Sequence, residues 1–226
     1  MLAVVYLIFN EGYLTGSGPE LLREDLCAEA IRLGRLLADL MPHEPEVLGL
    51  LALMLLSQSR RPARTTPDGD LVRLAEQDRG RWDQDLIREG QAIVRRCLRI
   101  GRPGPYQIQA AINAVHSEAP TTAATDWRQI VQLYDQHLAL APTPVVALHR
   151  AVAVAEADGP EVALALVEDL DLDGYHLYHA LRADLLRRLG RAAEAALAYE
   201  AALARTRNGA ERAFLEGRLR DLRRRP

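Results

Sequence analysis

The densest group of side chains able to do chemistry lies between residues 76 and 83, where acids, arginines and an indole alternate. Its members are Glu76, Asp78, Arg79, Arg81, Trp82 and Asp83. An arginine fork binds carboxylates through two parallel hydrogen bonds, so this pattern is typical of a pocket built from forks and acids. It is also typical of an internal salt-bridge network that orients a loop before the next helix. We favour the internal network, with Arg79 bridging carboxylates, and keep Asp78, Arg79, Trp82 and Asp83 as candidate contact residues.

A second polar group follows the apolar segment that opens the chain. Asn10, Glu11 and Tyr13 come directly after this segment. A charge at such a position must be solvated or paired, because burying it alone is costly. We therefore expect these three side chains to contact a partner or ligand, and we add Tyr106 and His116 as further candidate contacts.

Two patterns resemble metal sites but are incomplete. The run 169–174 begins like a calcium-binding loop, yet its twelfth position is Ala180, where a bidentate Glu should complete the shell. His176 and His179 stand three residues apart, but no further ligand follows at zinc-site spacing. We expect neither a metal nor a cofactor.

The absence of one residue type excludes several enzyme classes. All 28 basic residues are arginine, so no lysine is present for Schiff-base chemistry, pyridoxal phosphate attachment or a phosphate-binding Walker A loop. None of the four serines lies in nucleophile-elbow surroundings. We therefore expect a protein that is not an enzyme.

Charge and apolar runs indicate where the protein works. A formal net charge of −3 gives no basic footprint for direct nucleic-acid binding. The two cysteines, Cys27 and Cys97, lie far apart, which favours a reducing compartment. The longest apolar run, 47–56, is half the length that a membrane span needs. We expect a cytoplasmic protein without membrane contact.

The elements that must position these residues are helices. Ala and Leu supply 73 residues against 21 for Val and Ile, which favours an all-α fold. Apolar spacing and stop signals predict helices at 2–13, 21–40, 46–57, 83–99, 106–117, 126–139, 144–157, 161–170, 175–189, 191–206 and 210–222. The segment 46–57 is apolar on nearly every side, which is typical of a central helix.

The strongest cluster of helix breakers predicts a domain boundary. Gly101, Pro103, Gly104 and Pro105 stand almost together. We therefore predict an N-terminal helical domain at 1–101 and a second domain at 102–226.

A weak internal repeat lies in the second domain. A glycine is followed by a small residue at two matching points, Gly159 with Ala163 and Gly190 with Ala195. The two alanines are 32 residues apart. This spacing is close to the period of tetratricopeptide (TPR) units, in which small residues let paired helices approach closely. We predict TPR-like antiparallel hairpins that stack into a solenoid; the alternative is an ordinary alanine-rich hairpin.

Five motifs occur in order along the chain. They are LIFNEGY at 7–13, DLCAEAIRL at 25–33, EPEVLGLLALML at 44–55, EQDR with WD between 76 and 83, and PGPYQ with AAI between 103 and 112. Together they resemble the long C-terminal extension of a group of bacterial extracytoplasmic-function (ECF) sigma factors. In that group the extension ends in a TPR-like region and follows two promoter-binding domains. Neither of those domains is recognisable in these residues.

The resemblance implies a regulatory domain that acts in transcription initiation through protein contacts. Its partners would be the DNA-binding domains of the sigma factor, core RNA polymerase or a signalling protein. No catalytic residue carries over from the family's motifs.

Two other functions stay open at this stage. One is a small-molecule sensor or cryptic enzyme, with a pocket between the two halves that uses Glu11, Asp78, Arg79 and His116. The other is a generic TPR adaptor unrelated to transcription.

Overall fold

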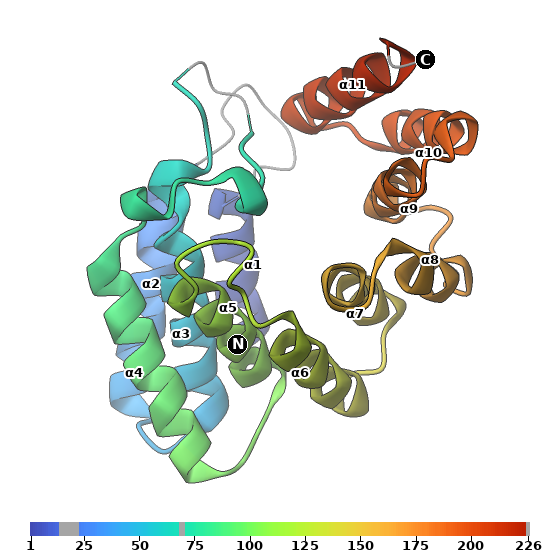
Figure 1. Cartoon of the computed structure of the whole chain (residues 1–226). Coiled ribbons are helices and arrows are strands. Elements are labelled where there is room, and N and C mark those ends of the chain that lie inside the picture. Colours follow the sequence, from blue (N-terminus) through green and yellow to red (C-terminus); the bar gives the residue numbers. More distant parts are fainter. Residues whose placement is uncertain (14–22, 68–70, 225–226) are drawn as a thin grey trace. The chain divides into compact units, whose positions relative to one another are not determined.

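The computed structural model describes residues 1–13, 23–67 and 71–224. Over these residues the chain forms eleven α-helices, three short 3₁₀ helices and one isolated bridge between Thr65 and Leu71 (Figure 1). The prediction of an all-α fold is confirmed. The chain divides into two compact units, Met1–Asp126 and Trp127–Pro226.

The predicted helices correspond one to one with the α-helices of the structure, and the three 3₁₀ helices were not predicted. Unit 1 contains α1 (Leu2–Tyr13), α2 (Glu24–Leu40), α3 (Pro45–Gln58), α4 (Gln84–Ile100) and α5 (Pro105–Glu118). Unit 2 contains α6 (Trp127–Leu140), α7 (Pro144–Ala157), α8 (Pro160–Glu168), α9 (His176–Arg188), α10 (Ala192–Arg205) and α11 (Gly209–Arg224). The predicted start of the second helix at Leu21 lies outside the described residues.

Unit 1 is built around α3. Every residue of α3 except Glu46 and Gln58 is buried, because α1, α2, α4 and α5 all pack against it. The resulting core contains Leu50, Met54 and Leu55, each almost fully excluded from solvent. The prediction of a central helix in this part of the chain is confirmed.

The structural division falls after Asp126 and not after Gly101, because α5 belongs to unit 1. Gly101 adopts φ +69° and ends α4, so the breaker cluster is a turn between two packed helices. The carboxylate of Glu46 on α3 accepts hydrogen bonds from the backbone N–H groups of Tyr106 and Gln107, at 3.1 and 3.2 Å. These bonds hold the first turn of α5 on α3.

Helices α3 and α5 approach so closely that only glycine fits at one position. A Cβ atom on Gly49 would lie 2.7 Å from both the backbone nitrogen and the Cγ of Gln107. The backbone of α5 cannot yield at that distance without losing its contacts with α3.

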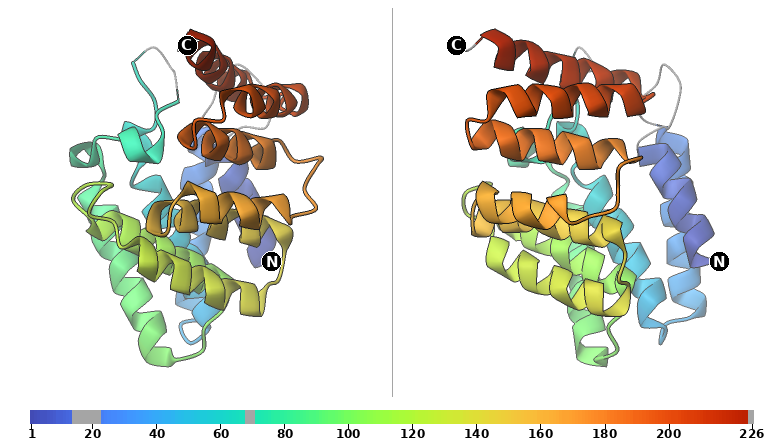
Figure 2. Two further views of the ribbon diagram at one scale, coloured as in Figure 1. Left: turned by 45° about the vertical axis from the view of Figure 1, so that its right-hand side comes forward. Right: turned by 90° about the vertical axis from the view of Figure 1, so that its right-hand side faces the viewer.

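In unit 2, helices that are consecutive in the sequence pack on one another from α6 to α11 (Figure 2). Gly159 and Gly190 adopt φ +100° and +75° and turn the chain between the helices of a pair, α7 with α8 and α9 with α10. Ala163 and Ala195 are completely buried just after these two glycines. Tyr199 is buried one helical turn after Ala195. The small side chains let the paired helices approach each other closely.

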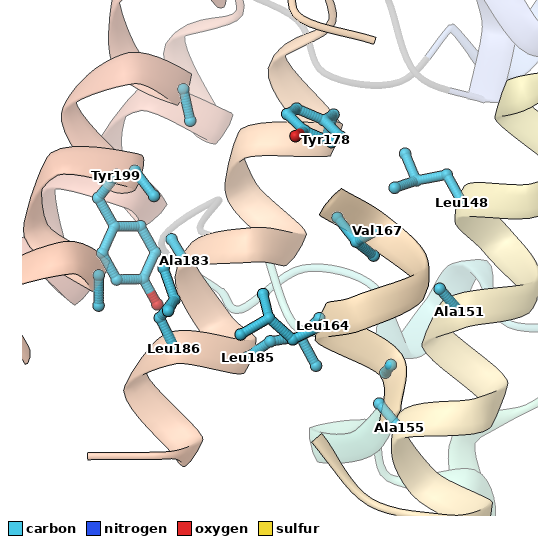
Figure 3. Close-up of a cluster of buried hydrophobic side chains, with 14 of the residues drawn as sticks. Leu148, Ala151, Ala155, Leu164, Val167, Tyr178, Ala183, Leu185, Leu186 and Tyr199 are labelled. Atoms are coloured by element: carbon cyan, nitrogen blue, oxygen red, sulfur yellow. The ribbon is translucent and has the colours of Figure 1, made fainter. Parts of the chain in front are cut away.

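One continuous apolar cluster joins these hairpins. Figure 3 shows Leu148 of α7 and Val167 of α8 on one side, and Tyr199 of α10 beside Ala183 and Leu186 of α9 on the other. Each helix therefore buries its apolar face against its neighbours in the chain.

We predict that Gly49→Ala destabilises the protein by about 1–3 kcal/mol, because the added Cβ overlaps the backbone of α5. Thermal unfolding followed by circular dichroism measures the effect. The matched control is Gly217→Ala on α11, where an added Cβ meets only Arg220 Nη2, at 3.9 Å. That change should stabilise by about 0.5–1 kcal/mol through helix propensity. Equal shifts for both variants would contradict the close approach of α3 and α5.

Candidate functional site

The loop between α3 and α4 carries the polar cluster singled out in the sequence. Asp78 accepts a hydrogen bond from Gly80 N, at 2.9 Å, and starts the 3₁₀ helix Arg79–Arg81. The Asp83 carboxylate caps α4 by accepting hydrogen bonds from the backbone N–H groups of Asp85 and Leu86. The Asp83 N–H donates to Ser59 O, at 2.9 Å, so the two ends of the loop are joined. Both carboxylates therefore shape the backbone locally.

Arg79 is the central side chain of this loop. Its Nη1 donates to the carbonyl oxygens of His116 and Ala119, the latter at 2.7 Å, and its Nη2 lies 3.5 Å from Thr125 Oγ1. Its guanidinium lies 4.7 Å from the centre of the Trp82 ring, in a cation–π contact. A cation at the C-terminal carbonyls of α5 is also favoured by the helix dipole. Arg79 thus ties the loop to the end of α5.

The predicted network is present, but the predicted acceptors are wrong. Arg79 was expected to bridge carboxylates, whereas it binds main-chain carbonyl oxygens. The physical reason is that the neighbouring acids, Asp78 and Asp83, are already used as caps by backbone N–H groups. The end of α5 offers carbonyl oxygens that lack partners within the helix.

His116 is buried next to the hydrogen bonds by which Arg79 holds the end of α5, which we call the Arg79 clamp. Burial, followed by the nearby charges of Arg60 and Arg79, lowers the pKa of His116 to about 3. Its imidazole is therefore neutral at pH 7. Arg60, in the loop after α3, also donates to Asn113 Oδ1, at 2.5 Å. Like Arg79, it thereby links this loop to α5.

The N-terminal candidates form two separate structural contacts. Asn10 hydrogen-bonds the Tyr6 hydroxyl, and the ring of Tyr6 meets Tyr106 edge-on with centroids 5.4 Å apart. Tyr13 lies under the guanidinium of Arg64, which is 3.8 Å from the ring centre and donates to Tyr13 O. These contacts fix α1 against α5 and against the loop after α3.

The structure brings together only part of the pocket suggested by the sequence. Arg79 and His116 are in contact, both within unit 1, whereas Glu11 and Asp78 are exposed. Arg60 was not among the predicted site residues, because no local sequence pattern indicates a hydrogen-bond partner more than fifty residues away.

A surface pocket of about 380 Å³ opens beside the loop. It is lined by Glu24, Gln58, Arg61, Pro62, Thr65, Asp83 and Leu86. Within the described part of the chain, the buried Oε1 of Gln58 has no hydrogen-bond partner. The lining therefore includes one residue whose amide oxygen is unsatisfied.

No group of three or more potential metal ligands is found among the described residues. His176 Nε2 lies 3.0 Å from Glu211 Oε2, and His179 Nε2 lies 2.8 Å from Asp173 O. The two histidines thus contact different neighbours. None of the described helices is long and apolar enough to cross a membrane.

Comparison with known proteins finds similarity across both units. Residues 1–98 match a family of unknown function, DUF6596. An uncharacterized protein of Rhizobium meliloti (strain 1021) is 50% identical over 218 residues, which cover 96% of this chain and 52% of that protein. The chain spans about half the length of this curated relative. No solved structure matches the chain.

We predict that Arg79→Lys destabilises the protein by about 1–3 kcal/mol although it keeps the charge, because an ammonium cannot span both carbonyls and the ring. Urea unfolding measures the loss. Arg81→Lys, at an exposed position of the same 3₁₀ helix, is the matched control and should change stability little. An unchanged unfolding midpoint in Arg79→Lys would contradict the clamp.

The depressed pKa of His116 predicts acid sensitivity. The unfolded chain binds a proton below about pH 6.5, whereas folded His116 resists it until about pH 3. Stability should therefore fall on acidification through this window, and His116→Gln should remove about 2–3 kcal/mol of the fall between pH 6.5 and 4.5. Urea unfolding at each pH, with exposed His43→Gln as control, measures the slope. A slope unaltered by His116→Gln would show that this imidazole is not responsible.

Proposed function

We propose that this chain is the regulatory C-terminal part of an ECF-type sigma factor and acts through protein contacts. The observation that carries the proposal is the ordered set of five motifs, which lie between residues 7 and 112 and resemble the extension of that group. Its partners would be the DNA-binding domains of the sigma factor, core RNA polymerase or a signalling protein. It would work in the cytoplasm, where transcription takes place.

The arrangement of unit 2 supports a binding role. We interpret its hairpins as TPR-like, because each pair turns at a glycine with positive φ and packs through buried alanines. Stacked helical pairs of this kind offer extended surfaces to protein partners. On this interpretation unit 2 is a solenoid-like binding region.

The length of the relative is also consistent with the proposal. That protein contains almost as much chain outside the matched region as within it. In the proposed function, the remaining half would contain the promoter-binding domains.

The chemistry of the loop favours a structural role over catalysis. The guanidinium of Arg79 is held by carbonyl oxygens and an indole ring, and both aspartates cap backbone turns. Side chains committed in this way position the loop rather than a substrate. We therefore propose a protein that is not an enzyme.

We predict saturable binding of the purified chain to the sigma DNA-binding domains or to core RNA polymerase from the same bacterium. Biolayer interferometry with the immobilised chain measures this, and an excess of free chain should compete. Circular dichroism first establishes that the chain is folded. A folded chain that binds neither partner would contradict the sigma-factor proposal. Capture of other proteins alone would favour the TPR adaptor.

The pocket beside the loop favours one alternative function, the sensing of a small polar molecule. Gln58 has a buried amide oxygen without a hydrogen-bond partner among the described residues, and the ion-paired side chains of Glu24 and Arg61 also line the pocket. A metabolite that raises the melting temperature of the wild type saturably, but not that of Gln58→Leu, would support this function.

A further inference from the structure

Helix α1 is apolar on both of its faces, yet the described residues of unit 1 cover only one of them. Val5, Phe9 and Gly12 are buried against the rest of the unit. On the other face Val4 and Leu7 are 59% and 66% exposed. They lie on one line with Glu11, at the three- and four-residue spacing of a helix face. We call Val4, Leu7 and Glu11 the α1 stripe.

A helix that is apolar all round is normally buried on all sides. The only charged side chain of α1 is Glu11, close to its C-terminal end. Isolated exposed leucines are common on protein surfaces, whereas contiguous exposed apolar patches mark interaction sites. The α1 stripe therefore has the composition of a face that a partner covers.

The charges around the stripe define the kind of partner. Helices α1 and α2, taken with the N-cap residue Arg23, contain five acidic side chains and three arginines. Each of these arginines, Arg23, Arg32 and Arg35, is already engaged by a carboxylate of unit 1 within 3.1 Å. Two further acids, Glu11 and Asp39, are exposed on α1 and α2. The charged side chains of α1 and α2 that no ion pair among the described residues engages are therefore both acidic, Glu11 and Asp39.

We propose that the α1 stripe is a docking site for a basic amphipathic helix. The apolar face of that helix would cover Val4 and Leu7, and its flanking Arg or Lys side chains would meet Glu11 and Asp39. Apolar burial would supply most of the affinity, and the charges would select basic over acidic helices. The identity of the protein that supplies this helix rests on the proposed function. In that function the helix belongs to the basic DNA-binding part of the sigma factor.

The surface is tested with a fluorescein-labelled synthetic peptide made of Leu and Lys, patterned as an amphipathic helix. Fluorescence anisotropy should show saturable binding to the folded chain that weakens as NaCl is raised, because salt screens exposed charges. A peptide with Glu in place of Lys, and one with the Leu and Lys order scrambled, should bind at least tenfold more weakly.

Leu7→Glu locates the site. It should weaken binding of the Leu-Lys peptide at least tenfold, because it removes apolar contact and places a carboxylate within the stripe. Leu197→Glu on α10 is the matched control, since Leu197 is also 66% exposed, and it should bind like the wild type. Circular dichroism and thermal unfolding establish that both variants remain folded.

Three results would overturn the proposal. The first is no binding by the folded wild type, or equal binding by Leu7→Glu. The second is concentration-dependent dimerisation in light scattering that Leu7→Glu abolishes, because the stripe would then bind a second copy. The third is flotation with phosphatidylcholine vesicles that depends on Leu7, because the stripe would then bind lipid.

The outcome is separable from that of the proposed function. If the peptide binds at the α1 stripe but the sigma DNA-binding domains and polymerase do not bind the chain, the surface stands and the sigma-factor proposal fails. If those partners bind the wild type and Leu7→Glu equally well, and the peptide does not bind, the docking site fails while the sigma-factor proposal stands.

Discussion

Covering α3 on all sides is the constraint that places the other helices of unit 1. A helix with almost no polar face must be surrounded, and α1, α2, α4 and α5 provide that cover. This packing brings the backbones of α3 and α5 very close together at Gly49 and Gln107. The same requirement draws α5 into unit 1, and the end of α5 then becomes the anchor for the loop that precedes α4.

The loop between α3 and α4 depends on this anchor. It has little apolar side-chain cover apart from Trp82, Ala63 and their neighbours, so its order comes from directed hydrogen bonds. Arg79 satisfies carbonyl oxygens that a helix end would otherwise leave to solvent. The cluster of acids, arginines and an indole therefore has a structural role in holding the loop in place.

The fold was more predictable than the site because helices depend on local pattern. Periodicity and breakers located every described α-helix, whereas the three 3₁₀ helices between α3 and α4 were not predicted. The choice of acceptors for Arg79 depends on which helix end lies nearby, and no local pattern contains that information. The boundary after Gly101 was misplaced for a similar reason: breakers mark the ends of helices, whereas contacts such as Glu46 with Tyr106 decide which helices belong together.

The consecutive packing of unit 2 has a consequence for how it comes apart. Because each helix rests mainly on its neighbours in sequence, the free energy of opening grows stepwise from the outermost helix inward. Helix α11 rests on α10, so it should exchange its amide hydrogens faster than α9, which is held from both sides. A surface at the end of such a stack can be remodelled by a partner without unfolding the middle. In unit 1 the helices surround α3, so this stepwise opening from an outermost helix is not expected there.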